Sequence, residues 1–545
     1  MSALMSKRDK SSMQRDMLQS SSKYQRATLS LCLAALLGGC SLAPDYHRPE
    51  SPVPGDWPTQ PKVQFGSAAG QVTLSEQPAS AVAPASTVPA ADIGWREFFR
   101  DPRLQALIEL ALVNNRDLRV AVESVEEARA QYGVQRGAQW PSIGAGIEGT
   151  RQRMPPNMRV GGEDSPSVSS SYQAGVGMTS FEIDLFGRLR SLSEAAYQTY
   201  LASEQSQRSV HITLVGAVAQ AYFNMRAADV QLDLTRKTLA ARQESYNLVK
   251  RRFDGGVASE MELNQSKSLL DSASADLAQL ARLRAQSVNA LTVLVGVPLP
   301  DNLPPPAEFG RDQLLATVPG GLPSDLLERR PDIMAAENNL KSANANIGAA
   351  RAAFFPTISL TGMLGVASPS LGTLFRGGQG AWSFSPSITT PIFAGGSIRE
   401  GLNLANARNN IAVAQYEQTI QQAFQEVSDA LAGEATYGAQ VESLRSLQDS
   451  TARTLELSNL RYVNGIDSYL QVQSAQVDYF NAQLSLVQAG LAALNNRVAL
   501  YKALGGGWSE VTPTASNANG AASGGNPAGT GATMPGASAT PASGS

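Results

Sequence analysis

Apolar positions in two long parts of the chain follow helical spacing. Ile420, Phe424, Val427 and Leu431 are three or four residues apart, as on one face of an α-helix. No proline occurs from 167 to 297 or from 392 to 512, so very long helices are allowed there. We predict helices at about 188–253, 259–295, 397–463 and 468–504, with tight turns at 254–256 and 464–465. Further helices are predicted at about 102–139 and 323–353, which could stack end to end with the helices at 259–295 and 468–504.

Four shorter stretches instead alternate apolar and polar residues with a period of two. They lie at 142–148, 172–179, 357–364 and 382–389 and are predicted to be β-strands close to the length that crosses a bilayer. Four strands cannot close a barrel, and an open sheet edge is not tolerated in lipid. Membrane strands would therefore require two, three or four copies, giving eight, twelve or sixteen strands. The alternative is a two-sided sheet in a soluble domain.

The chain also repeats itself. Arg116-Asp117-Leu118 recurs as Pro331-Asp332-Ile333, and Arg252-Phe253 recurs as Arg461-Tyr462. The offset stays between about 207 and 215 residues, which indicates one unit duplicated. We place the first repeat at 102–300, a linker at 301–322 and the second repeat at 323–508.

Composition excludes several classes of function. Charged residues are 17% of the chain, the formal net charge is −3, and there are two histidines and two cysteines among 545 residues. These numbers argue against a nucleic-acid surface, a His- or Cys-built metal site and a disulfide framework. The GxGxxG pattern at 144–149 lies in a predicted strand and does not fit a dinucleotide site. Glu182 and Asp184 are expected to face Arg188 and Arg190 where a strand ends, not to form a catalytic pair, so we predict no enzyme.

The two ends of the chain have their own compositions. Residues 1–39 carry basic residues, an apolar run at 29–37 and small residues before Cys40, as in an export signal. Leu37-Gly38-Gly39-Cys40 looks like a bacterial lipobox, which implies acylation of Cys40, while Ser41 suggests the outer membrane. Residues 40–101 follow as a lipidated N-terminal segment, and 49–91 are predicted to be an extended leader. Residues 509–545 are predicted to be disordered.

Together these motifs resemble the TolC-like outer-membrane factor family, in its OprM-like lipoprotein branch. The resemblance covers about residues 40–508 and rests on LGGC at 37–40, APDY at 43–46, FEIDLFGR at 181–188, ERRPDI at 328–333 and YKALGGGW at 501–508. It implies a mixed α/β membrane protein, a homotrimer whose twelve-stranded β-barrel continues as a periplasmic α-helical barrel. It also implies the exit duct of a tripartite drug-efflux pump, with a periplasmic adaptor and an inner-membrane transporter of the resistance-nodulation-division class.

The resemblance further assigns roles near the two helical turns. The region at 461–474 would close the periplasmic mouth, but Ser474 stands where the family often has Asp, so Glu262 beside the first turn is the candidate for an anionic ring. The ordinary alternative is that these are helix-surface residues. The gate candidates are Arg461, Tyr462, Leu470, Ser474, Glu262 and Gln265, and the exposed tips for adaptor contact are Gly255, Gly256, Val257, Gly465 and Ile466.

Other functions remain open at this point. The duct could serve a type I protein-secretion system, since the channel sequence barely distinguishes the exported cargo. A periplasmic scaffold anchored by lipid alone would have no membrane strands. No cofactor is expected other than the covalent lipid on Cys40, and the bound partners would be outer-membrane lipid and the two pump proteins.

Overall fold

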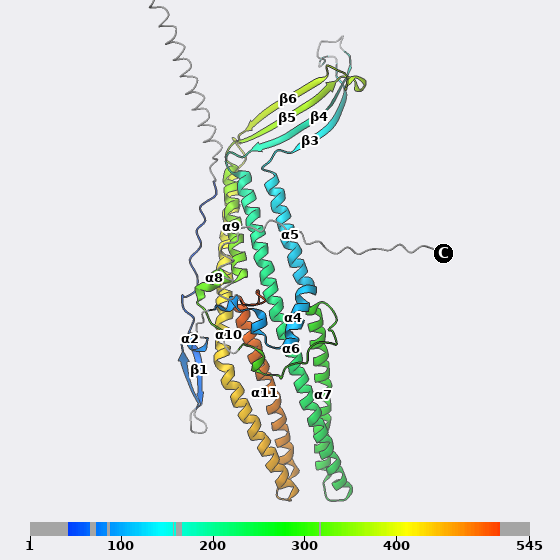
Figure 1. The fold of residues 1–545 in the computed structure, drawn as a ribbon, viewed down its shortest axis with the longest axis vertical. Coiled ribbons are helices and arrows are strands. Elements are labelled where there is room, and N and C mark those ends of the chain that lie inside the picture. The colour runs from blue at the N-terminus through cyan, green and yellow to red at the C-terminus, as the bar shows by residue number, and fades with distance from the viewer. Residues whose placement is uncertain are drawn as a thin grey trace, which may run out of the picture.

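The computed structural model describes residues 42–65, 72–83, 88–155, 157, 159, 166–315 and 318–512. The signal segment, Cys40 and residues 513–545 lie outside this part. The described chain is elongated, with a β-sheet at one end, a long bundle of helices, and two helical hairpins at the other end (Figure 1).

Four long helices form the two hairpins. In the first repeat, α6 (Arg188–Asp254) is followed by α7 (Glu260–Val295), and in the second α10 (Ser397–Val463) is followed by α11 (Tyr469–Ala503). The predicted helices are confirmed to within one residue at each end. α6 and α10 have 67 residues each, which corresponds to about 100 Å. No helix in the described ranges combines the length and apolarity needed to cross a membrane.

The two shorter predicted helices are each interrupted, so those predictions were partly wrong. The first consists of α4 (Pro102–Asn114) and α5 (Arg116–Gly137), and the second of η4 (Pro323–Asp325), α8 (Leu326–Arg329) and α9 (Pro331–Ala352). Asn115 and Arg330 have extended backbones at these breaks. Arg330 precedes a proline, whose ring disfavours the helical conformation at the residue before it. Asn115 uses its side chain to cap the new helix.

The expected end-to-end stacking occurs at the same two breaks. The end of α7 meets the α4–α5 break, where the Asn115 amide donates to the Leu294 carbonyl (2.9 Å). The end of α11 meets the α8–α9 break, where Arg330 donates to the Ala503 carbonyl (3.0 Å). Each pair of shorter helices thus runs alongside one long helix.

The four predicted strands form one antiparallel sheet in the order β3-β4-β5-β6. Their bounds are Ile143–Arg153, Val168–Ile183, Thr357–Ser368 and Gly380–Thr389. Each strand is longer than the alternating stretch that predicted it. β3 and β6 are the two edges and have no further strand partner within the described chain.

The prediction of an extended leader at 49–91 is wrong for much of that segment. It contains the antiparallel pair β1 (Gln60–Phe65) and β2 (Val72–Gln77), then α2 (Ala79–Val82) and η1 (Ala90–Asp92). β1 packs against α10, so tertiary contacts order a segment that has little periodicity of its own. The predicted start of the disordered tail, at residue 509, was also too early in the chain. The Ser509 carbonyl accepts a hydrogen bond from the backbone N–H of Trp95 in α3 (Trp95–Phe98).

The main core lies at mid-height, where both repeats meet the N-terminal segment. Phe98 stacks on Tyr501 with ring centroids 3.9 Å apart, and the Tyr501 hydroxyl donates to the Ile93 carbonyl. Tyr222, fully buried, donates to Asp101. The described residues also form the short helices η3 (Arg311–Gln313) and η5 (Leu371–Thr373).

Candidate functional site

The sheet has one apolar and one polar or small-residue face. Strand register places Ala145, Val176, Leu364 and Trp382 in one row across all four strands, and successive side chains alternate between faces. Other rows on the same side are Ile143, Met178, Gly362 and Phe384, then Phe181, Leu360 and Pro386, then Ile183, Ile358 and Ile388. The apolar side chains toward the edges of the sheet are exposed, with Leu364 at 71% and Trp382 at 77%, whereas Phe181 and Leu360 are half-buried. An exposed, continuous apolar face needs a non-aqueous or protein neighbour.

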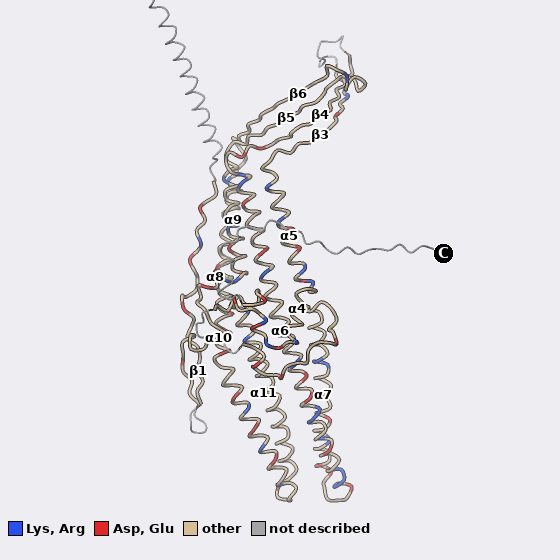
Figure 2. Tube along the Cα trace, in the orientation of Figure 1, with Lys and Arg blue, Asp and Glu red and all other residues tan. Residues whose placement is uncertain are grey.

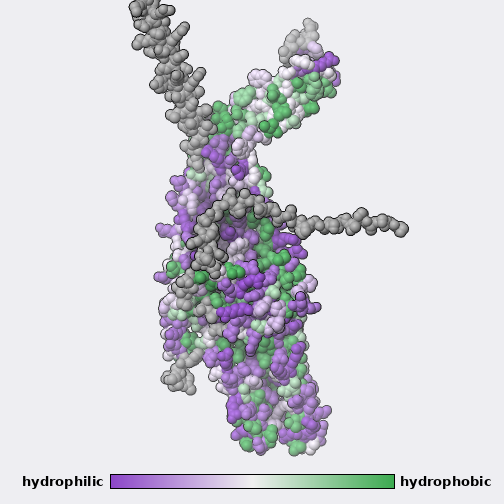
Figure 3. Space-filling model, in the orientation of Figure 1, coloured by the Kyte–Doolittle hydropathy of each residue, from purple (hydrophilic) through white to green (hydrophobic). Residues whose placement is uncertain are grey.

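The opposite face carries small and polar residues. Ser359 pairs with Ser387, and Gly146, Gly175 and Gly365 share a row. A Cβ at Gly365 would lie 2.1 Å from the Ala174 carbonyl oxygen, so only glycine fits there. β5 and β6 contain no charged residue, and Figure 2 shows the sheet almost free of charge in contrast to the helices. Figure 3 shows apolar patches along the sheet and a mostly polar surface at the helical tips.

Charged pairs mark the foot of the sheet, where β4 leads into α6. Arg188 donates to both oxygens of Glu182 (2.8 and 2.6 Å), and the backbone N–H of Arg190 donates to Asp184 (2.8 Å). The hydrogen bond that Arg188 donates to Glu182 raises the pKa of Arg188 despite partial burial. The prediction that these carboxylates face the two arginines is confirmed. Just before them, β4 is irregular, and Ser180 adopts a positive φ of 49°.

The two tips at the far end have the same turn. Gly256 and Gly465 have φ of 77° and 73°, a conformation that glycine adopts without strain. The N–H of Val257 donates to the Arg252 carbonyl (2.8 Å), and the N–H of Ile466 donates to the Arg461 carbonyl (2.9 Å). The tip residues Gly255, Gly256, Val257, Gly465 and Ile466 are all exposed.

Tyr462 links the two hairpins within one chain. Its hydroxyl accepts from Arg252, whose guanidinium also lies 5.1 Å from the Tyr462 ring centroid. Beside it the Tyr469 hydroxyl is 3.0 Å from the Ser245 hydroxyl, and Val249, Tyr469 and Val472 form a small buried cluster. Burial raises the pKa of Tyr462, which keeps the phenol neutral.

Arg461 has a different partner. Its guanidinium donates to both oxygens of Asp467 (2.6 and 3.0 Å) across its own turn, and this hydrogen bond lowers the pKa of the Asp467 carboxyl. Sequence reasoning missed Arg252 and Asp467 as partners. The internal repeat could have indicated Arg252 as a tip residue, because Arg252 is the first-repeat equivalent of Arg461.

The remaining gate candidates lie in the first two turns of α7 and α11. Leu470 and Ser474 are exposed, whereas Glu262 and Gln265 are half-buried. The negative charge of Glu262 helps to raise the pKa of the Tyr462 hydroxyl. The structure therefore places Glu262 close to the Arg252–Tyr462 link, while Leu470 and Ser474 make no hydrogen bond or ion pair that would define a role within one chain.

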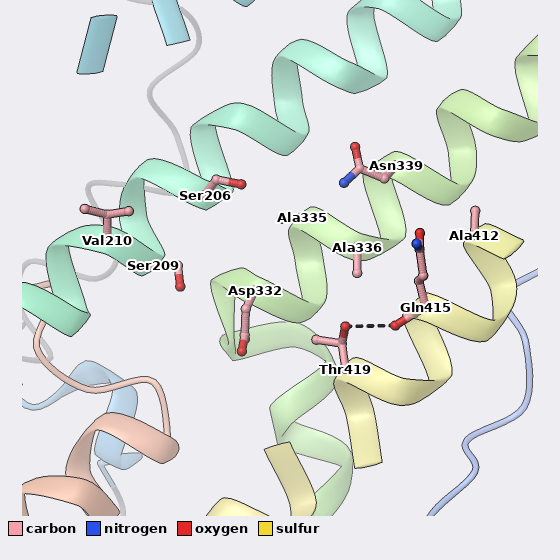
Figure 4. A pocket seen from close by; sticks show the side chains of 10 residues that line it. All are labelled: Ser206, Ser209, Val210, Asp332, Ala335, Ala336, Asn339, Ala412, Gln415 and Thr419. Carbon is pink, nitrogen blue, oxygen red and sulfur yellow. Dashed lines mark hydrogen bonds between the residues drawn. The ribbon is translucent and has the colours of Figure 1, made fainter. Parts of the chain in front are cut away.

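A hollow of about 420 Å³ lies between α6, α9 and α10 (Figure 4). Its walls carry Ser206, Ser209, Asn339, Gln415 and Thr419, and the Thr419 hydroxyl donates to the Gln415 carbonyl. Asp332 is the one ionisable residue lining it and is bound by Arg330 (3.0 and 2.5 Å). This arrangement provides no pair of a nucleophile and a base. The described residues also contain no group of three or more potential metal-ligating side chains.

Comparison with known proteins assigns this chain to a protein family. A family model described as outer membrane efflux protein matches residues 107–297 and 322–506. The chain belongs to the outer membrane efflux protein family. The chain is 48% identical over 492 residues to the probable efflux pump outer membrane protein TtgC of Pseudomonas putida, covering 90% of this chain and 98% of that protein. It is 40% identical over 481 residues to the outer membrane protein OprJ of Pseudomonas aeruginosa, covering 88% and 96%.

Solved structures agree with this membership. The open state of the MtrE outer membrane channel of Neisseria gonorrhoeae superposes with a TM-score of 0.75 at 38% identity, covering 87% of this efflux protein and all of that chain. A membrane protein from Pseudomonas aeruginosa gives a TM-score of 0.77 at 40% identity, covering 86% and 98%. The protein is an outer-membrane channel component of an efflux pump, located in the bacterial outer membrane with a periplasmic part, and its family is not an enzyme class.

Proposed function

We propose that three copies of the chain assemble into a duct, with a twelve-stranded barrel in the outer membrane and a helical barrel in the periplasm. The supporting observation is the sheet itself, with an exposed apolar face, a polar opposite face and two free edges in the described chain. Because β3 and β6 run antiparallel to each other in this order, β6 of one copy can continue onto β3 of the next. Closure would satisfy every edge, as a membrane requires.

The duct would serve a tripartite pump that exports drugs and other small molecules. Relatives named as antibiotic and toluene efflux pump proteins support this cargo class. A periplasmic adaptor would seat on the tips at 255–257 and 465–466, and an inner-membrane transporter of the resistance-nodulation-division class would supply the energy. An acyl group on Cys40 would anchor the chain in addition to the barrel.

Substitutions on opposite faces of one strand test the barrel. Leu360→Arg places a charge on the apolar face and should cost about 2–4 kcal/mol if that face meets the bilayer midplane. Ser359→Arg places the same charge on the polar face and should leave assembly intact. The measurement is the yield of SDS-resistant trimers in outer membranes, together with antibiotic susceptibility of cells that depend on this channel. Equal trimer yields for both variants would rule out this orientation of the sheet.

A further inference from the structure

The packing of the two repeats inside one chain shows how one copy can pack on the next. In the upper half of the bundle α6 packs on α9, with α5 on the other side of α6 and α10 on the other side of α9 (Figure 1). The contact of α6 with α9, here called the inner seam, joins the first repeat to the second. α5 leads into the edge strand β3, and the edge strand β6 leads into α10. These two helices therefore lie at the two ends of the layer.

The duplication relates the end helices to those of the inner seam. α6 and α10 have 67 residues each and begin 209 residues apart, at 188 and 397. α5 and α9 have 22 residues each and begin 215 residues apart, at 116 and 331. Every residue of the inner seam thus has one counterpart on α10 or α5. An outer seam, in which α10 of one copy packs on α5 of the next as α6 packs on α9, has residues that can be named.

An aromatic contact at the foot of the sheet gives the alignment of the outer seam. Phe186, which follows β4, stacks on Phe355, which precedes β5, with ring centroids 4.6 Å apart. Their counterparts are Phe393, which follows β6, and Trp140, which precedes β3. These two side chains are 91% and 72% exposed and lie at opposite ends of the layer. A second copy would bring them together as the first pair is brought together inside the chain.

Strand register agrees with this alignment. Ile183 pairs with Ile358, each three residues from its aromatic neighbour of the inner pair. The same spacing from Phe393 and Trp140 sets Ile388 opposite Ala145 of the next copy. Both belong to the apolar face of the sheet. A shift by one residue would instead place apolar side chains on the polar face, so the alignment continues both faces across the joint.

Small residues line the inner seam. On α6 the buried Ala195 and Ala202 lie on either side of Thr199, whose hydroxyl is 3.1 Å from the Ser342 hydroxyl of α9. Ala335, seven residues before Ser342 and on the same stripe of α9, is also buried. The polypeptide already joins the two halves of this seam, so their effective concentration is high and the seam needs little affinity of its own.

The counterparts on α10 are larger and exposed. Arg408 is the counterpart of Thr199, and Leu404 and Ile411 are the counterparts of the two buried alanines. Leu404 is 51% exposed and Ile411 57%, and Arg408 is exposed between them. Helix α10 therefore presents a guanidinium flanked by two large apolar side chains on the stripe that would enter the outer seam.

Helix α5 carries the complementary stripe. Glu127 is the counterpart of Ser342, and Val120 is the counterpart of the buried Ala335. Val134 lies seven residues beyond Glu127, on the same side of the helix. Both valines are well exposed, and Glu127 is exposed with one hydrogen bond from Gln131 of its own helix (3.2 Å). A carboxylate between two apolar side chains thus matches the guanidinium of α10 in position and in charge.

We propose that Arg408 of one copy forms an ion pair with Glu127 of the next, between the apolar stripes of the outer seam. The inference rests on the proposed assembly of copies and names the contact that selects the neighbour. Larger side chains hold two helices further apart within the usual 8–10 Å, which gives the long arginine and glutamate side chains room where two hydroxyls meet inside the chain.

The outer seam has a task that the inner seam lacks. Separate copies lose translational and rotational freedom when they associate, so this seam must supply affinity, and its larger apolar side chains bury more surface. The opposite charges add specificity. Pairing α10 with α10, or α5 with α5, would bring like charges together and is disfavoured, so only the head-to-tail arrangement that closes a ring is left.

Charge reversal tests the ion pair in the full chain. Arg408→Glu and Glu127→Arg each place like charges at every outer seam and should lower the yield of SDS-resistant trimers in outer membranes about tenfold. The double variant restores opposite charges and should return the yield to within about twofold of wild type. Arg399→Glu is the matched control, because it makes the same change on the opposite side of α10 and should leave the yield unchanged. Unchanged yields in both single variants, or a loss that the double variant does not restore, would overturn the ion pair.

Cysteine cross-linking tests the seam separately from the charges. A chain with Arg408→Cys and Glu127→Cys, treated with a short bismaleimide, should give covalent dimers and trimers on denaturing gels, because the two thiols meet only between copies. A chain with Thr199→Cys and Ser342→Cys should cross-link internally and run as a monomer. The wild-type chain, treated alike, reports the background from its own two cysteines.

The outcomes separate the seam from the duct. Trimers that form without covalent dimers or trimers in the first cysteine variant would overturn the outer seam and leave the proposed duct standing. Absence of trimers in the wild-type chain would overturn the duct, and the seam with it.

Discussion

The two repeats build the same joint with different chemistry. In both, a helix end stacks on a break between two shorter helices, and a glycine with positive φ ends the stacked helix, Gly296 at 80° and Gly505 at 84°. A Cβ at either glycine would lie within 3 Å of a carbonyl oxygen, that of Asn114 or of Arg329. The backbone geometry of the joint is therefore shared.

The side chains at the joint differ. In the first repeat the neutral Asn115 accepts from the Leu118 N–H and donates to Leu294, both at 2.9 Å. In the second repeat Arg330, 7% exposed, binds Asp332, Glu426 at 2.8 Å and the Ala503 carbonyl. Burial opposes its charge, yet the two carboxylates raise the pKa of Arg330. A duplicated backbone can thus keep its shape while one copy gains an ionic connection to α10.

The difference between the two joints predicts that truncating Arg330 and Asn115 to alanine lowers the stability of the protein by unequal amounts. Arg330→Ala removes a buried guanidinium, but the two carboxylates it leaves are partly exposed and screened by water, so the loss should be about 2–3 kcal/mol. Asn115→Ala removes one cap and one hydrogen bond and should cost about 1–2 kcal/mol. Thermal unfolding followed by circular dichroism, with the temperature of trimer dissociation, measures both. Equal losses would show that the ionic joint adds nothing beyond the neutral one.

The tips offer a second comparison, between Arg252 and its repeat equivalent Arg461. Arg252→Ala removes a charge-assisted bond of about 1.5–3 kcal/mol that links the two hairpins, so single-channel conductance in planar bilayers should rise. Arg461→Ala breaks an exposed pair within one turn, which contributes little because water and salt screen it. A larger rise for Arg461→Ala would instead support its contact with a neighbouring copy. Unchanged conductance in both variants would place the constriction elsewhere, with Leu470 and Glu262 next to test.

The strands differ in regularity. β4 has an irregular register at Ser180, whereas β5 pairs with β6 without interruption. A left-handed conformation costs a non-glycine residue about 1–2 kcal/mol, so Ser180→Gly should stabilise the trimer by about 0.5–1 kcal/mol after the entropy cost of glycine. Ser170→Gly, in the regular part of β4, should destabilise it. Trimer dissociation temperatures distinguish the two, and a loss for Ser180→Gly would show that the bend needs the serine.

Residues 42–48 lie along α9 and respond to acid in a predictable direction. The Glu337 carboxylate, 8% exposed, accepts from the Tyr46 hydroxyl (3.1 Å) and from Arg48 Nε and Nη2 (3.2 and 3.0 Å). Because the pKa of Glu337 is lowered in the folded chain, its contribution is complete above the ordinary glutamate pKa of about 4.3 and is lost as the pH falls through the lower folded value. A spin label at Asp45→Cys should therefore stay immobile from pH 8 to 5 and become mobile only after the pH has fallen below the ordinary glutamate pKa of about 4.3. Glu337→Gln should be mobile at every pH. An immobile label in that variant would show that the carboxylate charge is not what holds residues 42–48 against α9.

Much of the fold could be read from periodicity. The bounds of α6 and α10 and the positions of all four strands of the sheet follow from spacing of 3.6 or 2 and from proline-free stretches, which are local properties of the chain. The breaks at Asn115 and Arg330 were missed because the apolar spacing continues across them. The break at Arg330 has a local cause in the proline that follows it. At Asn115 the side chain meets the end of a distant helix, a contact that the local pattern does not contain.

The candidate site divides in the same way. The sequence determined the duplication, the amphipathic strands and the glycine turns at the tips, since each depends on neighbours in the chain. The export signal stays a prediction, because it lies outside the described residues. Only the tertiary structure decided that Tyr462 meets Arg252, that Arg461 turns back to Asp467, and that Glu337 receives residues about 290 positions earlier. Those contacts depend on how the long helices align and on where the N-terminal segment docks. A hydrogen bond needs its two groups about 3 Å apart, and that proximity exists only once the chain has folded.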